Sequence, residues 1–170
     1  MLCDPCLLYL YKQIKDNDMV KKVFFALKVD DFPTLETIEQ ESGLTDHQVR
    51  DALHFLRGAG LTWGNGCHGL SESGYRLLEL LGDTEQPEPA ETLCDDCLLE
   101  IGQGLPKETF TVLAQLADRM AHTRHDLILG TEITFGQIRS ILRILEGAGL
   151  IQSGRGRVFR LSETGQRLEK

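Results

Sequence analysis

Hydrophobic positions recur with a helical period in two stretches of this chain. The first stretch, VRDALHFLRGAGL at residues 49–61, has apolar side chains at i, i+3, i+4 and i+7, namely Val49, Ala52, Leu53 and Leu56. The second stretch, IRSILRILEGAGL at 138–150, repeats this spacing with Ile138, Ile141, Leu142 and Leu145. Because such positions lie on one face of a helix, each stretch predicts an amphipathic helix with one buried stripe.

The flanking residues predict the same order of elements twice. Residues 34–61 have a helix–turn–helix pattern, in which Ser42-Gly43-Leu44 forms the turn and Thr45 caps the next helix; Thr134 is the corresponding cap further along. Glycines end both helices, and β-hairpins are predicted at 61–71 and 150–162, with tight turns at Asn65-Gly66 and Gly154-Arg155-Gly156. Further helices are predicted at 7–14, 20–29, 73–81, 98–105, 107–120 and 164–170.

Three blocks of sequence occur twice in the same order. CDPCLL at 3–8 matches CDDCLL at 94–99 with an offset of 91, and the two amphipathic helices match with an offset of 89. LSESGYRL at 70–77 matches LSETGQRL at 161–168, again with an offset of 91. Ordered blocks with compensating two-residue gaps indicate an internal duplication.

An acidic stretch separates the two copies. DTEQPEPAET at 83–92 contains two prolines, four acidic residues and almost nothing apolar, which is typical of a linker. The sequence therefore predicts a first domain at 1–82, a linker at 83–93 and a second domain at 94–170.

The order helix, helix–turn–helix, hairpin resembles the winged helix-turn-helix regulators of bacteria and archaea. It is most similar to the MarR-like and ArsR-like branch, whose sequences often run GL-turn-V-x-x-x-L-x-x-L-x-x-x-GL followed by L-T-x-x-G. The resemblance covers most of the first copy and about the last 40 residues of the second. It implies a mainly α fold with small β-hairpin wings (α+β), two tandem winged-helix domains and a transcription regulator that binds double-stranded DNA. Winged helices also serve as protein-interaction modules, so a protein-interaction adaptor in a larger complex is the alternative.

The resemblance assigns DNA contacts to the second helix of the turn and to the wing. In the second copy these positions hold Gln137, Arg139, Ser140 and Arg143 on the helix, and Arg155, Arg157 and Arg160 on the hairpin. Arginine and glutamine read base edges, and wing arginines suit phosphates or a narrow minor groove. The first copy offers the weaker set Gln48, Arg50 and His54, and its Asp46 and Asp51 would repel phosphate. The plainer interpretation is a solvated arginine face.

The charge distribution also favours the second copy as the one that contacts DNA. The chain has a net charge of −8, which argues against a general nucleic-acid binder. Residues 1–82 carry −4 and residues 83–93 another −4, whereas residues 94–170 are neutral, with ten basic and ten acidic side chains. We therefore expect DNA contacts mainly from the second copy and a basic protein partner, if any, on the acidic first copy. A homodimer would present two such DNA-binding surfaces.

The duplicated Cys-x-x-Cys pairs are the strongest chemical signal. Cys3 with Cys6, and Cys94 with Cys97, stand at equivalent positions of the two copies. Structural zinc takes four ligands in a tetrahedron, and two such pairs supply four thiolates. If the copies pack about a pseudo-twofold axis, their equivalent N-termini can meet. The sequence thus predicts one metal site, with zinc as the metal, that joins the two domains.

Three alternatives remain for these cysteines, the plainest of which is that inherited cysteines pack as small apolar residues. The same four thiolates could hold an iron–sulfur cluster. Alternatively, each pair precedes an apolar helix whose N-terminus would lower a thiol pKa, so each pair could cycle separately between dithiol and disulfide in a redox-sensing regulator. Asp4, Asp95 and Asp96 oppose the redox interpretation because they destabilise nearby thiolate, and for the same reason they are unfavourable beside a four-thiolate zinc site.

Other function classes find less support. The sequence contains no Gly-rich phosphate loop that joins a strand to a helix and no recognisable catalytic set, so we do not expect an enzyme. No apolar run is long enough to span a bilayer and no signal-peptide pattern is present, so we expect a cytoplasmic protein that does not bind membranes.

Overall fold

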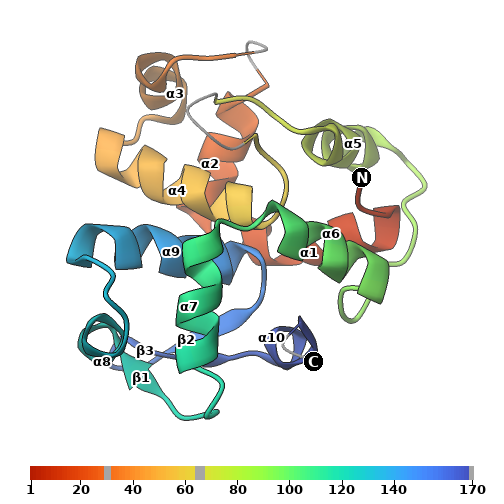
Figure 1. Cartoon of the computed structure of the whole chain (residues 1–170). Helices are drawn as coiled ribbons and strands as arrows, with labels where there is room; N and C mark the ends of the chain where they lie inside the picture. The colour runs from red at the N-terminus through yellow and green to blue at the C-terminus, as the bar shows by residue number, and fades with distance from the viewer. Residues whose placement is uncertain (29–31, 64–67, 169–170) are drawn as a thin grey trace.

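The computed structural model describes residues 1–28, 32–63 and 68–168 and is mainly helical (Figure 1). The N-terminal half, residues 1–82, contains α1 (Asp4–Lys15), α2 (Asp18–Ala26), α3 (Leu35–Ser42), α4 (Asp46–Gly58) and α5 (Glu72–Gly82). The C-terminal half, from residue 94, contains α6 (Asp95–Gly104), α7 (Lys107–Gln115), β1 (His122–Thr123), α8 (Arg124–Gly130), α9 (Phe135–Gly147), β2 (Ile151–Gly154), β3 (Val158–Leu161) and α10 (Glu163–Leu168). The predicted mainly α, α+β class is confirmed.

The strands of the C-terminal half form an antiparallel sheet in the order β1-β3-β2. β2 and β3 make the predicted hairpin: Gly154 pairs with Val158, which leaves residues 155–157 as the turn. β1 adds a strand that the sequence did not predict, because two residues are too few to show a period.

Of the hairpin predicted for the N-terminal half, the described residues form one β-bridge and one further backbone hydrogen bond. Thr62 and Leu70 form an isolated antiparallel bridge, and the Trp63 N–H donates to the Gly69 carbonyl at 3.1 Å. The predicted Asn65-Gly66 turn, together with Cys67, lies outside the described residues.

The predicted caps begin α4 and α9. Both Thr45 and Thr134 form a capping box with the glutamine three residues later, so side chains satisfy two of the free N–H groups at the start of each helix. Of the two predicted stripes, that of α9 is fully buried, and that of α4 is buried except for Leu53, which is half-buried.

The two halves pack against each other chiefly through α4 and α9, which run side by side in the same direction at the centre of the molecule (Figure 1). α2 and α3 cover α4, and α7 and α8 cover α9. A Cβ atom on Gly58 would overlap the backbone carbonyl of Ile144, and one on Gly147 would overlap that of Phe55. Glycine at both positions therefore permits a closer helix contact than any other residue would.

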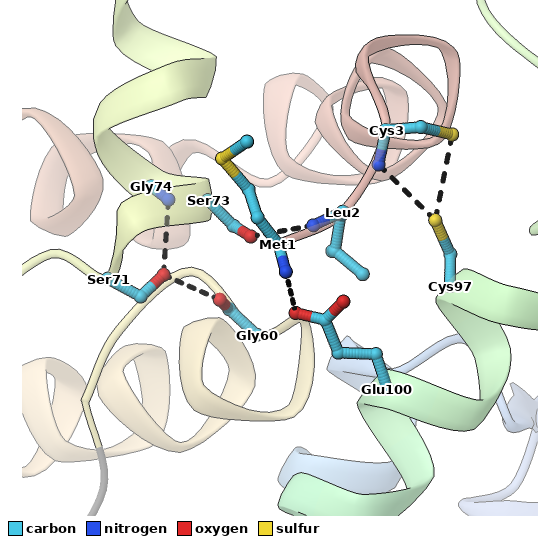
Figure 2. A network of polar contacts seen from close by, with 9 residues as sticks. All are labelled: Met1, Leu2, Cys3, Gly60, Ser71, Ser73, Gly74, Cys97 and Glu100. Carbon is cyan, nitrogen blue, oxygen red and sulfur yellow. Dashed lines mark hydrogen bonds and ion pairs between the residues drawn. The ribbon is translucent and has the colours of Figure 1, made fainter.

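One hydrogen-bond pattern ties the end of each long helix to the final helix of its half. Ser71 donates to the Gly60 carbonyl at 2.6 Å and accepts from the Gly74 N–H at 3.1 Å, as Figure 2 shows. Ser162 repeats this pattern with Gly149 at 2.5 Å and the Gly165 N–H at 2.9 Å. The repeated GAGL and LSExG sequences thus form one structural unit, in which serine caps a helix and satisfies a carbonyl at once.

We expect Ser162→Ala to lower the free energy of unfolding by about 1–3 kcal/mol, because it removes a helix cap and leaves the Gly149 carbonyl without its serine donor. Chemical denaturation measures the change. Ser153→Ala, on an exposed position of the hairpin, is the matched control and should change stability by less than about 0.5 kcal/mol. Equal effects of the two substitutions would contradict this role for Ser162.

The predicted linker is exposed over most of its length but is fixed at its end. Residues 82–89 are exposed, whereas the Ala90 N–H donates to the Pro5 carbonyl at 3.0 Å and Leu93 is completely buried. Leu2 is buried in the same way in the N-terminal half. Each leucine directly precedes the first cysteine of its half, so both Cys-x-x-Cys segments start from a residue anchored in the core.

Candidate metal centre and hairpin surface

The four predicted ligands lie at the N-termini of two helices. Cys3 and Cys94 are the N-cap residues of α1 and α6, and Cys6 and Cys97 lie in the first turn of these helices. A Cys-x-x-Cys spacing places both sulfur atoms near the same helix end, because residues three apart lie on one face. Cys3 and Cys94 are exposed, whereas Cys6 and Cys97 are buried.

The structure brings all four sulfur atoms together. They lie within 4.8 Å of one another, and all four cysteines are free thiols. In a tetrahedral zinc site with Zn–S bonds of about 2.3 Å, the sulfur atoms are about 3.8 Å apart. The Cys3 and Cys97 sulfur atoms are 3.6 Å apart. The cluster therefore has the size of a four-thiolate metal site, and the contact between the Cys3 and Cys97 sulfur atoms joins the two halves.

Backbone hydrogen bonds cross between the halves in a reciprocal pattern. The Cys3 N–H donates to Cys97 Sγ at 3.3 Å, as Figure 2 shows, and the Cys94 N–H donates to Cys6 Sγ at the same distance. N–H donors stabilise negative charge on sulfur. Each half thus orients a buried sulfur of the other half, as expected for an approximate twofold arrangement.

Burial strongly affects the protonation of these thiols. Loss of solvent raises the pKa of Cys6 to about 11 and also raises the pKa of Cys97 above its usual value. The pKa of Cys94 is lowered, chiefly by a hydrogen bond from the Cys97 backbone N–H. A bound metal cation would favour the deprotonated form of these thiols, because the thiolate is the metal ligand.

Two of the three acidic residues beside the cysteines bind arginines. Arg76 on α5 binds Asp4 through two hydrogen bonds of 2.9 and 2.6 Å, and hydrogen bonding to this guanidinium lowers the pKa of Asp4. Arg167 on α10 donates one hydrogen bond to Asp95. Our expectation that Asp4 and Asp95 disfavour thiolate omitted these arginines. Their signal in the sequence is that both recur at the offset of 91, in SGYRL and TGQRL.

The predicted DNA-reading positions of α9 make other contacts in this structure. Arg139 donates to Asp51 of α4 at 2.5 Å, and Arg143 donates to Glu146 at 2.7 Å. Gln137 accepts from Thr134 in the capping box, and Ser140 is half-buried. Asp51, expected on the surface as a residue that repels phosphate, is only 7% exposed. The contact between α4 and α9, which periodicity did not reveal, buries it beside Arg139.

The hairpin positions are open to solvent. Arg155, Arg157 and Arg160 are all exposed, and Arg157 stands in the left-handed backbone region at the turn. In the N-terminal half, Gln48 serves in a capping box and Arg50 binds Asp46 at 2.8 Å. His54 is half-buried, and burial lowers its pKa. The hairpin arginines are thus exposed, whereas Arg139, Arg143 and Arg50 bind carboxylates.

Comparison with protein-family models, curated proteins and solved structures gave no match. Among the described residues, no helix combines the length and the apolar character needed to cross a membrane.

Proposed function

We propose that this protein is a DNA-binding transcription regulator, built of two winged-helix copies that a shared four-cysteine zinc site holds together. The observation that carries the proposal is the convergence of four sulfur atoms from two equivalent helix N-termini to within 4.8 Å. Zinc is preferred to an iron–sulfur cluster because Cys₄ sites with Cys-x-x-Cys pairs are typical of structural zinc. Separate redox pairs are disfavoured because the hydrogen bonds to sulfur run between the halves.

The repeated contacts support the duplication. Ser71 with Ser162, Arg76 with Arg167, and Gly58 with Gly147 each make the same kind of contact in the two halves. Metal binding would fix α1 and α6 together and thereby set the angle between the copies. If the metal is labile, its loss would change this angle, and DNA affinity would follow it to the extent that DNA distinguishes the two geometries.

The hairpin of the C-terminal half supports DNA as the partner. Three exposed arginines within six residues make the hairpin basic, although the protein as a whole is acidic. Arginines on a wing suit phosphates or a narrow minor groove. Because Arg139 and Arg143 are engaged by carboxylates, the hairpin would supply most contacts at first encounter. A homodimer would double this surface.

The proposal predicts salt-dependent binding to duplexes selected from a random DNA pool. Arg155→Ala with Arg160→Ala should weaken binding and reduce the slope of log affinity against log salt by about 0.9 for each phosphate that the variant no longer neutralises. Fluorescence anisotropy over a salt series measures both quantities. Lys107→Ala, an exposed cation at the start of α7, is the control and should leave the slope nearly unchanged. Absence of DNA binding at low salt would contradict the proposal.

The packing of α4 on α9 favours a second candidate, a protein-interaction adaptor. α4 and α9 are the helices predicted to enter the major groove of DNA. Part of the surface of each is covered by the other, so less of either helix is free to contact bases. The acidic N-terminal half would then bind a basic protein partner. Failure to bind DNA at low salt, combined with salt-sensitive binding of a basic protein, would favour this function.

A further inference from the structure

A recess of about 400 Å³ lies between α8, α9 and the hairpin of the C-terminal half. Four arginines line it: Arg124 from the start of α8, Arg139 and Arg143 from α9, and Arg157 from the hairpin turn. Phe159, which is buried, and Leu142 give it an apolar side. Arginines from three elements therefore line one concave space.

The recess keeps positive charge after its internal ion pairs are counted. Two carboxylates bind these arginines: Asp51 accepts from Arg139 at 2.5 Å, and Glu146 accepts from Arg143 at 2.7 Å. Four arginines against two carboxylates leave an excess of two positive charges, in a protein whose net charge is −8. Each guanidinium has five N–H donors, so the paired arginines also keep donors for a further acceptor.

Arg124 has an unsatisfied donor. Its Nε atom is buried without a hydrogen-bond partner, and it is the one such side-chain atom among the described residues. Its guanidinium lies over the Phe135 ring, 5.7 Å from the centroid, which holds the group in place. A buried N–H without an acceptor is unfavourable, so a shift of the Arg124 side chain that brought this N–H to a ligand oxygen would be favoured.

The N-terminal half provides an internal comparison. At an offset of 89, Leu35 and His54 stand where Arg124 and Arg143 stand, and Arg57 replaces Glu146. Thr34 nevertheless caps α3 as Thr123 caps α8, and α4 forms as α9 does. Since the same elements form without the arginine cluster, the fold does not require it.

We infer that this recess binds a small molecule that carries a phosphate monoester. The planar forks of several arginines match the oxygens of a phosphate group, and the volume leaves room for an organic part against Phe159 and Leu142. Duplex DNA is a less suitable occupant because Arg124 is recessed, whereas the exposed Arg155 and Arg160 do not line the recess. The inference depends neither on the zinc site nor on DNA binding.

Phenyl phosphate is a suitable probe, with inorganic phosphate at equal ionic strength as its comparison. Isothermal titration calorimetry on the whole protein should show saturable binding of phenyl phosphate that is tighter than that of inorganic phosphate. Arg124→Gln and Arg157→Gln should each weaken this binding at least about tenfold, since a hydrogen bond to a charged group contributes on that scale. Arg155→Gln removes the same charge from the hairpin outside the recess and should change affinity less than about twofold.

The variants separate the outcomes. Arg157 is exposed, so its replacement leaves the core intact, and a thermal melt of each variant verifies folding. Equal losses for Arg155→Gln and Arg157→Gln would overturn the inference, because general electrostatics would then explain the binding. No saturable binding of phenyl phosphate, together with weaker duplex binding by Arg124→Gln, would also overturn it and assign the recess to the DNA backbone.

Discussion

Replacing Gly147 with alanine should lower the free energy of unfolding by about 3 kcal/mol or more. An added Cβ atom would overlap the Phe55 carbonyl, and this backbone atom belongs to α4, so relief requires the two central helices to separate. Overpacking in a well-packed contact costs about 1–3 kcal/mol, and the overlap here involves backbone on both sides, which has little freedom to move. Chemical denaturation of the purified variant measures the loss.

Gly136→Ala is the matched control because Gly136 lies in the same helix with nothing within 4 Å of the added Cβ position. In a helix, alanine is preferred to glycine by about 0.5–1 kcal/mol, so this variant should be as stable as the original protein or more so. Gly58→Ala should behave like Gly147→Ala, since a Cβ atom there overlaps the Ile144 carbonyl. If neither Gly58→Ala nor Gly147→Ala changed the free energy of unfolding, α4 and α9 would not pack as closely as in this structure.

Cys97→Ser should remove the bound metal and about 4 kcal/mol of stability. A ligand that binds only the folded state stabilises it by about 4 kcal/mol when its free concentration is 1,000 times its Kd. Thermal unfolding, with and without a chelator, measures this contribution. The chelator should destabilise the original protein and leave Cys97→Ser unchanged, because that variant has no complete site to lose.

Cys67→Ser controls for cysteine replacement in general. Cys67 has no counterpart in the second repeat and is not one of the four predicted ligands. The Cys67→Ser variant should keep both the bound metal and the loss of stability on chelation. A chelator effect of equal size in the Cys97→Ser variant would show that the stabilising metal lies elsewhere.

Local signals in the sequence predicted the elements well. Thr45 and Thr134 were recognisable as caps because each is a threonine just before an amphipathic helix, and the contacts of a cap lie within a single turn. The meeting of Cys3, Cys6, Cys94 and Cys97 was also predictable, although 87 residues separate the inner pair, because the repeat made their positions equivalent.

The contact between α4 and α9 could not be predicted from periodicity. A hydrophobic stripe reveals the face that packs within one half, whereas Ile144 and Gly147 lie off the stripe of α9 and face the other half. Asp51 has no apolar signal at all, and its burial depends on Arg139, 88 positions further along the chain. A charged residue becomes buried when its partner is supplied by tertiary structure, which a single sequence does not show.

The role of Arg124 in the arginine-lined recess also could not be predicted from local sequence signals. Arg124 follows a helix cap, a place where a surface residue is expected, and only the arrangement of α8, α9 and the hairpin turns it toward three other arginines. The comparison of the two repeats, position by position, could have singled it out, because Leu35 occupies the equivalent place.

Metal content tests the central claim most directly. The protein should be purified without a histidine tag, its metals measured by mass spectrometry, and its free thiols titrated before and after chelation. The account predicts about one zinc per chain and four additional reactive thiols after chelation, one for each cysteine of the cluster. Protein without metal, whose thiols oxidise reversibly in pairs, would contradict the shared site, and iron with visible absorption would contradict zinc in favour of a cluster.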